Sequence, residues 1–390
     1  MRAIIECIYK SNYQNLSFPS KEKELQILCD SLGIANTSNT EIKIGTVHND
    51  EKMTALLSGK TVNLDELNFL AKRLDSFDAN ELTTFYAVAY AEKSESLKDL
   101  INLTFNTHCY SVVADFSDLN AVGKQMYLTE QGAVNPMELQ NFDGQGYFEQ
   151  IIQNNPNLIV TPYGIVYRNK NEYEHIYDGK HFPQYNWKEN MGTVTIAKDN
   201  KQEYLYLPFE ETELAKTLQR LGTENIEECE IEIDSEFLSY KILDTITEGK
   251  AITDKMMCIA GFAKRIEEIG INEKPHLDIL IDCLNPQTEK DLNIIMDSMY
   301  EFEVLPNIHT AEEYGRYMIC DSGHFEYDEN LEEYIDFKGY GSHRMKCENG
   351  AFTNAGYIVY HGYNMELSDM APMLARALGG PWTLGKRQLD

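Results

Sequence analysis

The sequence predicts an α+β fold made of two tandem copies of one elongated module, in which small antiparallel sheets alternate with short helices. Three observations lead to this prediction. A helix followed by a strand is encoded with clear periodicity in residues 205–236. The same order of elements occurs near the start of the chain, in residues 16–44, at a constant shift in numbering. Further matches continue through the rest of each copy at a nearly equal shift.

The segment 205–236 defines the repeated unit. An extended apolar stretch leads into a helix predicted over residues 210–221, because leucines recur there at i, i+4 and i+7 and three glutamates lie in the first turn. Gly222 is placed to end this helix. Residues 230–234 alternate between acidic residues and isoleucine, so a strand would carry both isoleucines on one face and three carboxylates on the other.

Residues 16–44 repeat this order of an extended stretch, a leucine-striped helix, a glycine and a strand. Gly33 corresponds to Gly222 and Ile42 to Ile231, and the shift is 189 in both pairs. Later matches have a shift of 192, which implies that the second copy gained about three residues. These later matches are 71–74 with 263–266, 98–100 with 290–292, and 123–124 with 315–316.

The repeat sets the expected domain boundaries. We expect a first copy at 1–168, a linker at 169–193, a second copy at 194–364 and a C-terminal helical tail at 365–390. In the first copy, the patterns predict a strand at 4–9, helices at 64–74, 78–91, 94–102 and 119–128, strands at 107–113 and 158–167, and looser structure at 140–157. In the second copy, they predict helices at 262–269, 277–283, 287–300 and 311–318 and a strand at 357–360, followed by a tail helix at 367–378.

Charge is the most unusual bulk property of the chain. Its 63 acidic residues exceed its 34 lysines and arginines, which gives a net charge of −29. Direct nucleic-acid binding and binding to anionic membranes both require a basic surface, so neither is expected. A partner chosen by charge should be basic. An acidic surface that serves only solubility is the simplest alternative.

The eight cysteines are scattered and form no CxxC pair, so we expect reduced thiols in a cytoplasmic protein. The N-terminus reads as a strand rather than a signal segment, and no apolar run is long enough to span a membrane.

Motifs that carry catalysis are not evident. The sequence has no GxxxxGK[ST], GxGxxG, HExxH or GxSxG motif. His108 and Cys109 are adjacent in a predicted strand, where their side chains would point to opposite faces and could not meet. We therefore expect no enzyme activity, no cofactor and no bound metal. A metal-dependent enzyme built on paired carboxylates remains an alternative.

The acidic residues fall into series that could form a binding surface. A surplus of 29 negative charges equals the charge of about 15 base pairs of duplex DNA, which carries one charge per ~1.7 Å of axis. The candidate partner-binding residues are Glu210, Glu211, Glu224, Glu227, Glu228, Glu230, Glu232, Asp234, Glu236, Glu301, Glu303, Glu312, Glu313, Glu326, Asp328, Glu329, Glu332, Glu333 and Asp336. For any single series, a plain solvated face is the simpler interpretation.

Part of the second copy resembles a known family. Ala311–Tyr317, Leu331–Gly341 and Gly350–Thr353 resemble the closing module of ArdA-type antirestriction proteins. The run Tyr-Ile-Asp-Phe at 334–337, followed by Tyr-Gly at 340–341, is the most specific part. The resemblance extends from about Tyr204 to His361. The first copy is more diverged, and Leu-Gln-Asn-Phe at 139–142 stands nearest to that run.

The resemblance implies a DNA mimic. Proteins of this family are carried by conjugative plasmids and transposons, and their acidic surface imitates bent B-form DNA and occupies the DNA-binding cleft of type I restriction–modification enzymes. Family members are typically single modules that dimerise, so two modules in one chain would form a covalent pseudo-dimer, with a homodimer as a further possibility. The alternative function is an acidic adaptor or inhibitor that binds another basic host-defence protein without mimicking DNA.

Overall fold

The computed structural model describes residues 3–113, 117–154, 158–326, 328–348, 350–353 and 356–361. The chain divides into two compact units, Met1–Asp234 and Ser235–Asp390, called here the first and the second unit. Small antiparallel sheets alternate with helices in both, which confirms the predicted α+β class. The division follows Asp234 rather than falling in the expected linker at 169–193. The module boundaries concern sequence repetition and stay a prediction.

The first unit begins with a four-stranded antiparallel sheet in the order β2-β1-β3-β4. Its strands are β1 (Ala3–Tyr9), β2 (Asn12–Phe18), β3 (Glu41–His48) and β4 (Thr61–Asn63). Helix α1 (Glu22–Leu32) connects β2 to β3, and α2 (Glu51–Leu57) follows β3. Ile42 and Ile44 are fully buried while their neighbours in β3 are exposed, as the alternating pattern requires.

A helical layer follows this sheet. Its members are α3 (Leu64–Asp75), α4 (Ala79–Ala91) and α5 (Leu97–Asn106). Their apolar faces join the sheet, α1 and α2 in one hydrophobic core, which also contains Phe85 and Leu100 at 0% exposure. The α3 and α4 helices match their predicted ranges closely, whereas α5 begins three residues later than the predicted Ser94, because Ser96 is the residue whose side chain caps it.

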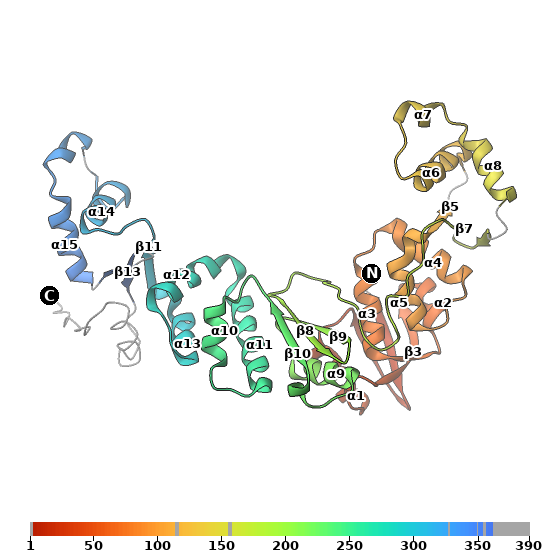
Figure 1. The fold of residues 1–390 in the computed structure, drawn as a ribbon, viewed down its shortest axis with the longest axis horizontal. Helices are drawn as coiled ribbons and strands as arrows, with labels where there is room; N and C mark the ends of the chain where they lie inside the picture. The colour runs from red at the N-terminus through yellow and green to blue at the C-terminus, as the bar shows by residue number, and fades with distance from the viewer. Residues whose placement is uncertain are drawn as a thin grey trace. The chain divides into compact units, whose positions relative to one another are not determined.

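The remainder of the predicted first copy is a small sheet with three helices. The short 3₁₀ helix η1 (Thr107–Cys109) leads into a sheet of order β5-β7-β6, with strands β5 (Tyr110–Val113), β6 (Ile159–Thr161) and β7 (Gly164–Arg168). Figure 1 shows the accompanying helices α6 (Leu119–Gln131), α7 (Pro136–Asn141) and α8 (Gly144–Asn154). The expectation of looser structure at 140–157 is wrong, because most of this segment forms α8, whose Phe148 packs beside Met126 of α6.

The first unit ends with the segment on which the sequence prediction was built. Strands β8 (Thr193–Lys198), β9 (Lys201–Tyr206) and β10 (Glu230–Asp234) form a sheet of order β10-β8-β9. Helix α9 (Glu211–Leu221) and the 3₁₀ helix η2 (Ile226–Glu228) lie between β9 and β10. Gly222 adopts a left-handed conformation with φ of 77°, as expected for a residue that ends a helix.

The second unit has a helical part followed by a small sheet with flanking helices. The helical part contains α10 (Tyr240–Thr247), α11 (Ile252–Ile269), η3 (Ile271–Glu273), α12 (Lys274–Leu284), α13 (Glu289–Ser298) and η4 (Met299–Glu301). The sheet has the order β11-β13-β12, with strands β11 (Phe302–Leu305), β12 (Ala351–Thr353) and β13 (Gly356–Tyr360). Its helices are α14 (Ala311–Arg316), the π-helical turn η5 (Tyr317–Asp321), the 3₁₀ helix η6 (Glu329–Tyr334) and α15 (Phe337–Glu348).

Elements recur along the chain at the two shifts seen in the sequence. Helix α9 follows α1 at a shift of 189, and α13 follows α5 at a shift of 192. The sheet order β5-β7-β6 recurs as β11-β13-β12, with every strand beginning 192 residues later. Within these sheets, the Thr161 hydroxyl donates to the carbonyl of Gly164, and the Thr353 hydroxyl donates to that of Gly356. The recurrence therefore includes element bounds, strand order and individual hydrogen bonds.

The expected linker packs against the first unit. We call residues 173–187 the strap. Two side-chain amides of α5 hold its backbone: Asn102 pairs with both backbone groups of Tyr177 at 2.9 Å, and Asn106 pairs with both of Glu174 at 2.8 Å. Tyr177 is 1% exposed, and its ring stacks on Phe182 at a centroid distance of 5.3 Å. The strap is therefore part of the folded unit.

The predicted tail helix at 367–378 lies outside the described residues, as does the whole segment after His361. Among the helices that are described, none is long and apolar enough to cross a bilayer.

Candidate partner-binding surface and a buried charge network

The acidic strand β10 is the most regular part of the predicted surface. It lies at the edge of its sheet, and its exposure alternates along the strand. Glu230, Glu232 and Asp234 are exposed, while the two isoleucines between them are half-buried. Within the described residues, none of these three carboxylates forms an ion pair. The strand therefore presents three charges in a row, about 6.6 Å apart at ~3.3 Å per residue.

The acids that precede β10 extend this row. Glu224 and Glu227 are exposed, and η2 positions Glu227 because Asn225 caps its backbone amide. Glu228 is exposed but paired, with its carboxylate 2.5 Å from Lys198 Nζ and 2.9 Å from the hydroxyl of Thr223. The hydrogen bond from Lys198 and then that from Thr223 lower the pKa of Glu228.

At the start of α9, Glu210 and Glu211 are exposed next to the helix N-terminus, where the helix dipole favours negative charge. Glu210 is the N-cap residue, and its backbone amide donates to Glu213 at 2.9 Å. These two acids therefore have a local structural role in addition to any partner-binding role.

In the second unit, the predicted acids gather around α14 and η6. Glu312 and Glu313 are exposed in the first turn of α14, where Glu313 accepts hydrogen bonds from the backbone amides of His309 and Thr310 at 2.7 and 3.0 Å. The bond from His309 is the main cause of the lowered pKa of Glu313. Glu332 of η6 pairs with Arg316 at the end of α14 and is half-buried.

The remaining acids of this group are exposed, and several of them cap short helices. Asp328 caps η6 through the amide of Asn330 at 3.0 Å, and Asp336 accepts from the amide of Gly339 at 2.8 Å. The exposed members of the group are Glu236, Glu303, Glu326, Asp328, Glu329, Glu333 and Asp336.

Two predicted acids near β11 have aromatic or imidazole partners. Glu301 is half-buried and accepts from the Tyr360 hydroxyl at 2.5 Å. Glu303 is exposed, and its carboxylate lies 2.9 Å from Nε2 of His361. The structure therefore places the acids from Glu210 to Asp234 in the first unit and those from Glu236 to Asp336 in the second.

The expectation about His108 and Cys109 is corrected by the structure. Both residues lie in η1 rather than in a strand, so their side chains can turn towards each other, and Sγ of Cys109 is 3.6 Å from Nε2 of His108. Cys109 is fully buried, and its thiol lies 3.2 Å from the carbonyl oxygen of Glu172. Burial raises the pKa of this thiol, which favours the protonated, weakly nucleophilic form.

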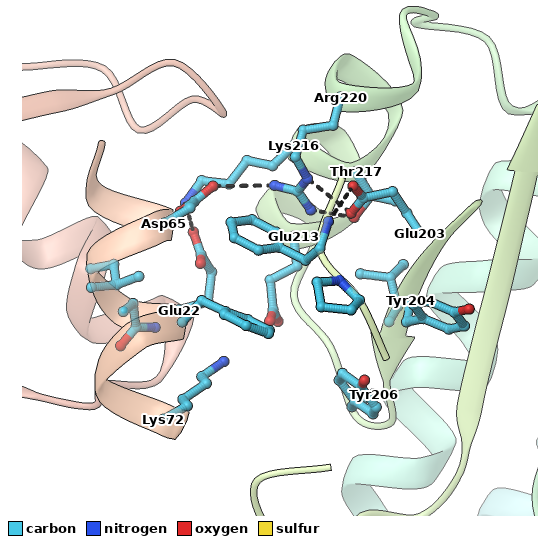
Figure 2. A pocket seen from close by; sticks show the side chains of 16 residues that line it. Glu22, Asp65, Lys72, Glu203, Tyr204, Tyr206, Glu213, Lys216, Thr217 and Arg220 are labelled. Atoms are coloured by element: carbon cyan, nitrogen blue, oxygen red, sulfur yellow. Dashed lines mark hydrogen bonds and ion pairs between the residues drawn. The ribbon is translucent and has the colours of Figure 1, made fainter. Parts of the chain in front are cut away.

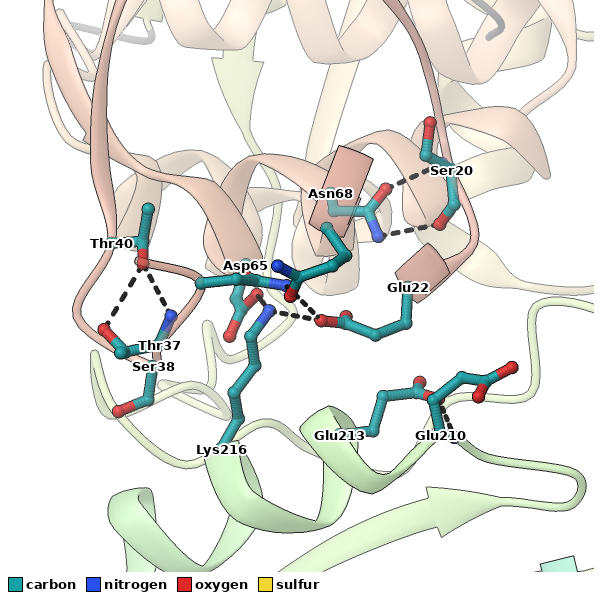
Figure 3. Close-up of polar contacts among 12 residues, drawn as sticks. Ser20, Glu22, Thr37, Ser38, Thr40, Asp65, Asn68, Glu210, Glu213 and Lys216 are labelled. Atoms are coloured by element: carbon teal, nitrogen blue, oxygen red, sulfur yellow. Dashed lines mark hydrogen bonds and ion pairs between the residues drawn. The ribbon is translucent and has the colours of Figure 1, made fainter. Parts of the chain in front are cut away.

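Sequence reasoning missed a buried charge network inside the first unit. Figure 2 shows charged side chains from α1, α3, α9 and β9 around a cavity of about 100 Å³. Lys216 of α9 is 3% exposed, and its Nζ lies 2.7 Å from Asp65 and 2.8 Å from Glu22. Figure 3 shows the same lysine extending from α9 towards these two carboxylates. Helix α9 is therefore joined to α1 and α3 by charge pairing as well as by apolar packing.

Arg220 continues the network one turn further along α9. Its guanidinium lies 3.2 Å from Asp65 and 2.9 Å from Glu203, a β9 residue whose side chain is 1% exposed. The same guanidinium lies over the Phe182 ring of the strap, 5.0 Å from the centroid. The strap, β9 and α3 thus meet at one arginine.

Burial and neighbouring charge act in opposite directions in this network. Burial lowers the pKa of Lys216, but the carboxylates of Asp65 and Glu22 outweigh it and raise that pKa above its ordinary value. Burial lowers the pKa of Lys72. Burial raises the pKa of Glu213 to about 7, against the opposing effects of the Glu210 amide and Lys72. Glu213 is therefore a member of the network whose pKa lies near neutral pH.

A sequence signal for this network existed but is weak. Lys216 and Arg220 are four residues apart in α9, so they share one face of the helix. Their partners are distant in sequence, because Asp65 precedes Lys216 by 151 positions. No local pattern identifies such a partner.

No three His, Cys, Asp or Glu side chains of the described residues converge in a way that could hold a metal ion. A comparison of the chain with protein-family models and with curated protein sequences gives no match.

Proposed function

We propose that this protein is an antirestriction protein of the ArdA type. In this proposal it acts in the cytoplasm as an acidic mimic of duplex DNA, and it occupies the DNA-binding cleft in the methyltransferase core of a type I restriction–modification enzyme. The motif at 334–341 and the acidic composition support the proposal. The observation that carries it is the exposed row of Glu230, Glu232 and Asp234 on an edge strand.

The spacing of this row suits the proposed role. Same-face carboxylates on a strand are about 6.6 Å apart, and phosphates of one DNA strand are separated by about 3.4 Å along the helix axis. Alternate phosphates are therefore about 6.8 Å apart along that axis, close to the spacing of the carboxylates. Basic side chains that contact phosphates could pair with carboxylates of such a row.

The proposed mechanism is competitive binding without turnover, and the protein needs no cofactor and no direct nucleic-acid contact. Charge supplies most of the attraction, so the affinity of the protein for the enzyme should fall as the salt concentration rises. The two recurring series of elements would be two modules that act as a pseudo-dimer within one chain. Carboxylates lack the condensed counterions of DNA, so the salt dependence should be shallower than that of DNA itself.

A competition experiment tests the proposal. A type I methyltransferase core is bound to its labelled recognition duplex, and the protein is titrated into the complex at several salt concentrations. We expect displacement of the duplex, with an inhibition constant that rises with salt. The triple variant Glu230→Gln, Glu232→Gln, Asp234→Asn should inhibit at least about tenfold less well, a factor that corresponds to 1.4 kcal/mol.

A matched control separates the site from net charge. The triple variant Glu51→Gln, Glu95→Gln, Glu267→Gln removes three exposed acids outside the predicted surface and should inhibit like the unmodified protein. Equal losses in both variants would mean that only total charge matters. Binding to the enzyme without displacement of DNA would instead support the adaptor function.

A further inference from the structure

The strap of the first unit covers a surface formed by α3 and α5. Phe182 of the strap stacks on Phe69 of α3 at a centroid distance of 4.9 Å. The Tyr177 hydroxyl donates to Glu66 of α3 at 2.9 Å. The guanidinium of Arg73, also on α3, lies 4.4 Å from the ring centroid of Tyr185. Positions 66, 69 and 73 of α3 therefore all contact the strap.

In the second unit, none of the described residues covers the corresponding surface as the strap does. In the sequence, α11 of the second unit corresponds to α3 of the first unit, and α13 corresponds to α5, each at a shift of 192 residues. Helices α11 and α13 line a groove of about 710 Å³. Among its lining residues are Cys258, Gly261 and Arg265, which correspond to Glu66, Phe69 and Arg73 at that shift. A Cβ atom added to Gly261 would have no atom within 4 Å, so the groove has room for an incoming side chain.

We propose that residues 362–390 of the same chain bind in this groove and take the place of the strap. Their position in the sequence favours this occupant, because the strap follows β7 directly and residues 362–390 follow β13 in the same way. The strap reaches its Tyr177 anchor nine residues after Arg168, the end of β7, and the C-terminal segment has 29 residues. The available length is therefore sufficient.

The composition of the segment also fits the groove. Residues 362–390 contain three acids and three lysines or arginines, so the segment has no net charge and the rest of the chain carries the full −29. Such a segment can approach an acidic protein without repulsion. The groove is lined by apolar side chains, which include Ile246, Met257 and Phe262, and by the charged side chains of Lys250, Asp254, Arg265 and Glu289. The apolar residues available in the segment include Met365, Leu367, Met370, Met373, Leu374 and Leu378.

One difference between α5 and α13 determines how residues 362–390 would be held in the groove. The amides that hold the strap, Asn102 and Asn106, correspond to Ile294 and Ser298 in α13. Ile294 has no polar side-chain group, and the single hydroxyl proton of Ser298 is already donated to the Ile294 carbonyl at 2.7 Å. The C-terminal segment is therefore held by burial of its apolar side chains, which accords with its methionines and leucines.

Cys258 provides a test in the full-length chain. Its thiol lines the groove, 2.8 Å from Lys250 Nζ, so a bound segment would slow its reaction with a small thiol reagent. The rate is measured for each cysteine by mass spectrometry. The tail variant Leu374→Asp, Leu378→Asp should label at Cys258 at least about tenfold faster than the unmodified chain, because each 1.4 kcal/mol of lost binding is a factor of ten.

Controls make each outcome decisive. The variant Ser368→Asp, Thr383→Asp adds the same two charges at polar positions of the segment and should leave the rate unchanged. Cys320, which lies in η5 and does not line the groove, should label equally in all variants, and Cys283 should stay slow unless the unit unfolds. Equal labelling of Cys258 in the unmodified and double-leucine chains would overturn the proposal.

A crosslinking experiment identifies the occupant. A photoreactive residue at position 261 should crosslink to peptides of 362–390 within one chain, at a yield independent of protein concentration. Isotope-labelled and unlabelled chains are mixed to distinguish the chains. Crosslinks that join two chains, or that reach another segment, would contradict the proposed occupant.

Discussion

Lys216 of α9 and Asp65 of α3 form an ion pair of 2.7 Å in which the two side chains are only 3% and 11% exposed. Glu22 of α1 completes the group at 2.8 Å from the same nitrogen. Charges removed from water in this way are stabilising only while all partners are present, because each lost its hydration when the unit folded. Lys216 is therefore one of the main polar contacts between α9 and the elements α1 and α3, together with Arg220, which also pairs with Asp65.

We predict that Lys216→Met strongly destabilises the first unit. The variant would leave Glu22 buried without its cation and Asp65 with Arg220 alone, and breaking a buried pair typically costs about 3–5 kcal/mol. Trp187 of the strap, whose indole donates to Asp75 at 3.0 Å, reports unfolding of this unit by fluorescence in a Trp382→Phe background. Adding Glu22→Gln and Asp65→Asn should restore part of the loss. The control Lys198→Met, which breaks the more exposed pair with Glu228, should have a much smaller effect.

The stability of the first unit should fall as the pH rises from about 5 to about 8. Burial raises the pKa of Glu213 to about 7, so the folded state binds a proton between the ordinary pKa of 4.5 and that value, and the unfolded state does not. The contribution of this proton is lost as the pH rises through the folded pKa. Lys72, Glu22 and Lys216 face the carboxyl group and act on the same equilibrium.

Glu213→Gln should reduce this slope and make the unit more stable than the unmodified protein at pH 8. Glutamine keeps an oxygen that can accept the hydrogen bond from the Glu210 amide. One pKa unit is worth about 1.4 kcal/mol, and partial solvent access reduces the effect, so we expect a difference of about 1–2 kcal/mol across this range. Denaturant unfolding at several pH values measures it. A slope that persists unchanged in the variant would assign the effect to Glu66 or Glu203, whose pKa values burial also raises.

The elements with strong local patterns were predictable from sequence, and the site residues only partly. Helix α9 and strand β10 match their predicted ranges because leucine periodicity, Gly222 and the Glu–Ile alternation all act within a few residues. Helix α8 was missed because it begins with Gly144 and Gly146, which are typical of a turn and precede all of its apolar residues. Exposure of the β10 acids followed from the same alternation.

Long-range partners set the limit of prediction. Asp65 meets Lys216 across 151 positions and Asn102 meets Tyr177 across 75. The polar composition of residues 169–193 predicts a linker, and its Trp187 and tyrosines favour packing but do not identify what it packs against; two amides of α5 and a stacked aromatic pair hold the strap in place. Such specific contacts are decided by the folded arrangement, and no pattern within the segment encodes them.

The strap should open when its amide clamps are removed. Asn102→Ala and Asn106→Ala each leave a backbone donor and acceptor of the strap without a partner, which costs about 1–3 kcal/mol per unsatisfied group. Amide hydrogen exchange at Glu174 and Tyr177 should accelerate about tenfold for each 1.4 kcal/mol by which the substitution destabilises the closed strap. Asn141→Ala, which removes an exposed amide bonded to the Met137 carbonyl at 3.0 Å, is the control and should leave these rates unchanged.

Gly315 and Gly261 both lie in helices of the second unit, and substitution by alanine should have opposite effects on stability at these two positions. A Cβ atom on Gly315 would lie 1.9 Å from the carbonyl oxygen of Phe337, a backbone atom at the start of α15 that cannot move aside without shifting that helix. Gly123 is constrained in the same way in the first unit, where its Cβ would lie 1.7 Å from the carbonyl oxygen of Gly144. Close packing of two helix backbones thus requires glycine at both positions.

We therefore expect Gly315→Ala to destabilise the packing of α14 against α15 by about 1–3 kcal/mol or more, the usual cost of an overpacked contact. Gly261→Ala should instead stabilise α11 by about 0.5–1 kcal/mol, because its new Cβ meets no atom of the described residues and alanine loses less conformational entropy than glycine in a helix. Hydrogen exchange in α14 and α11 measures the two effects separately. If Gly315→Ala left exchange in α14 unchanged, then α14 and α15 would not pack backbone to backbone as described.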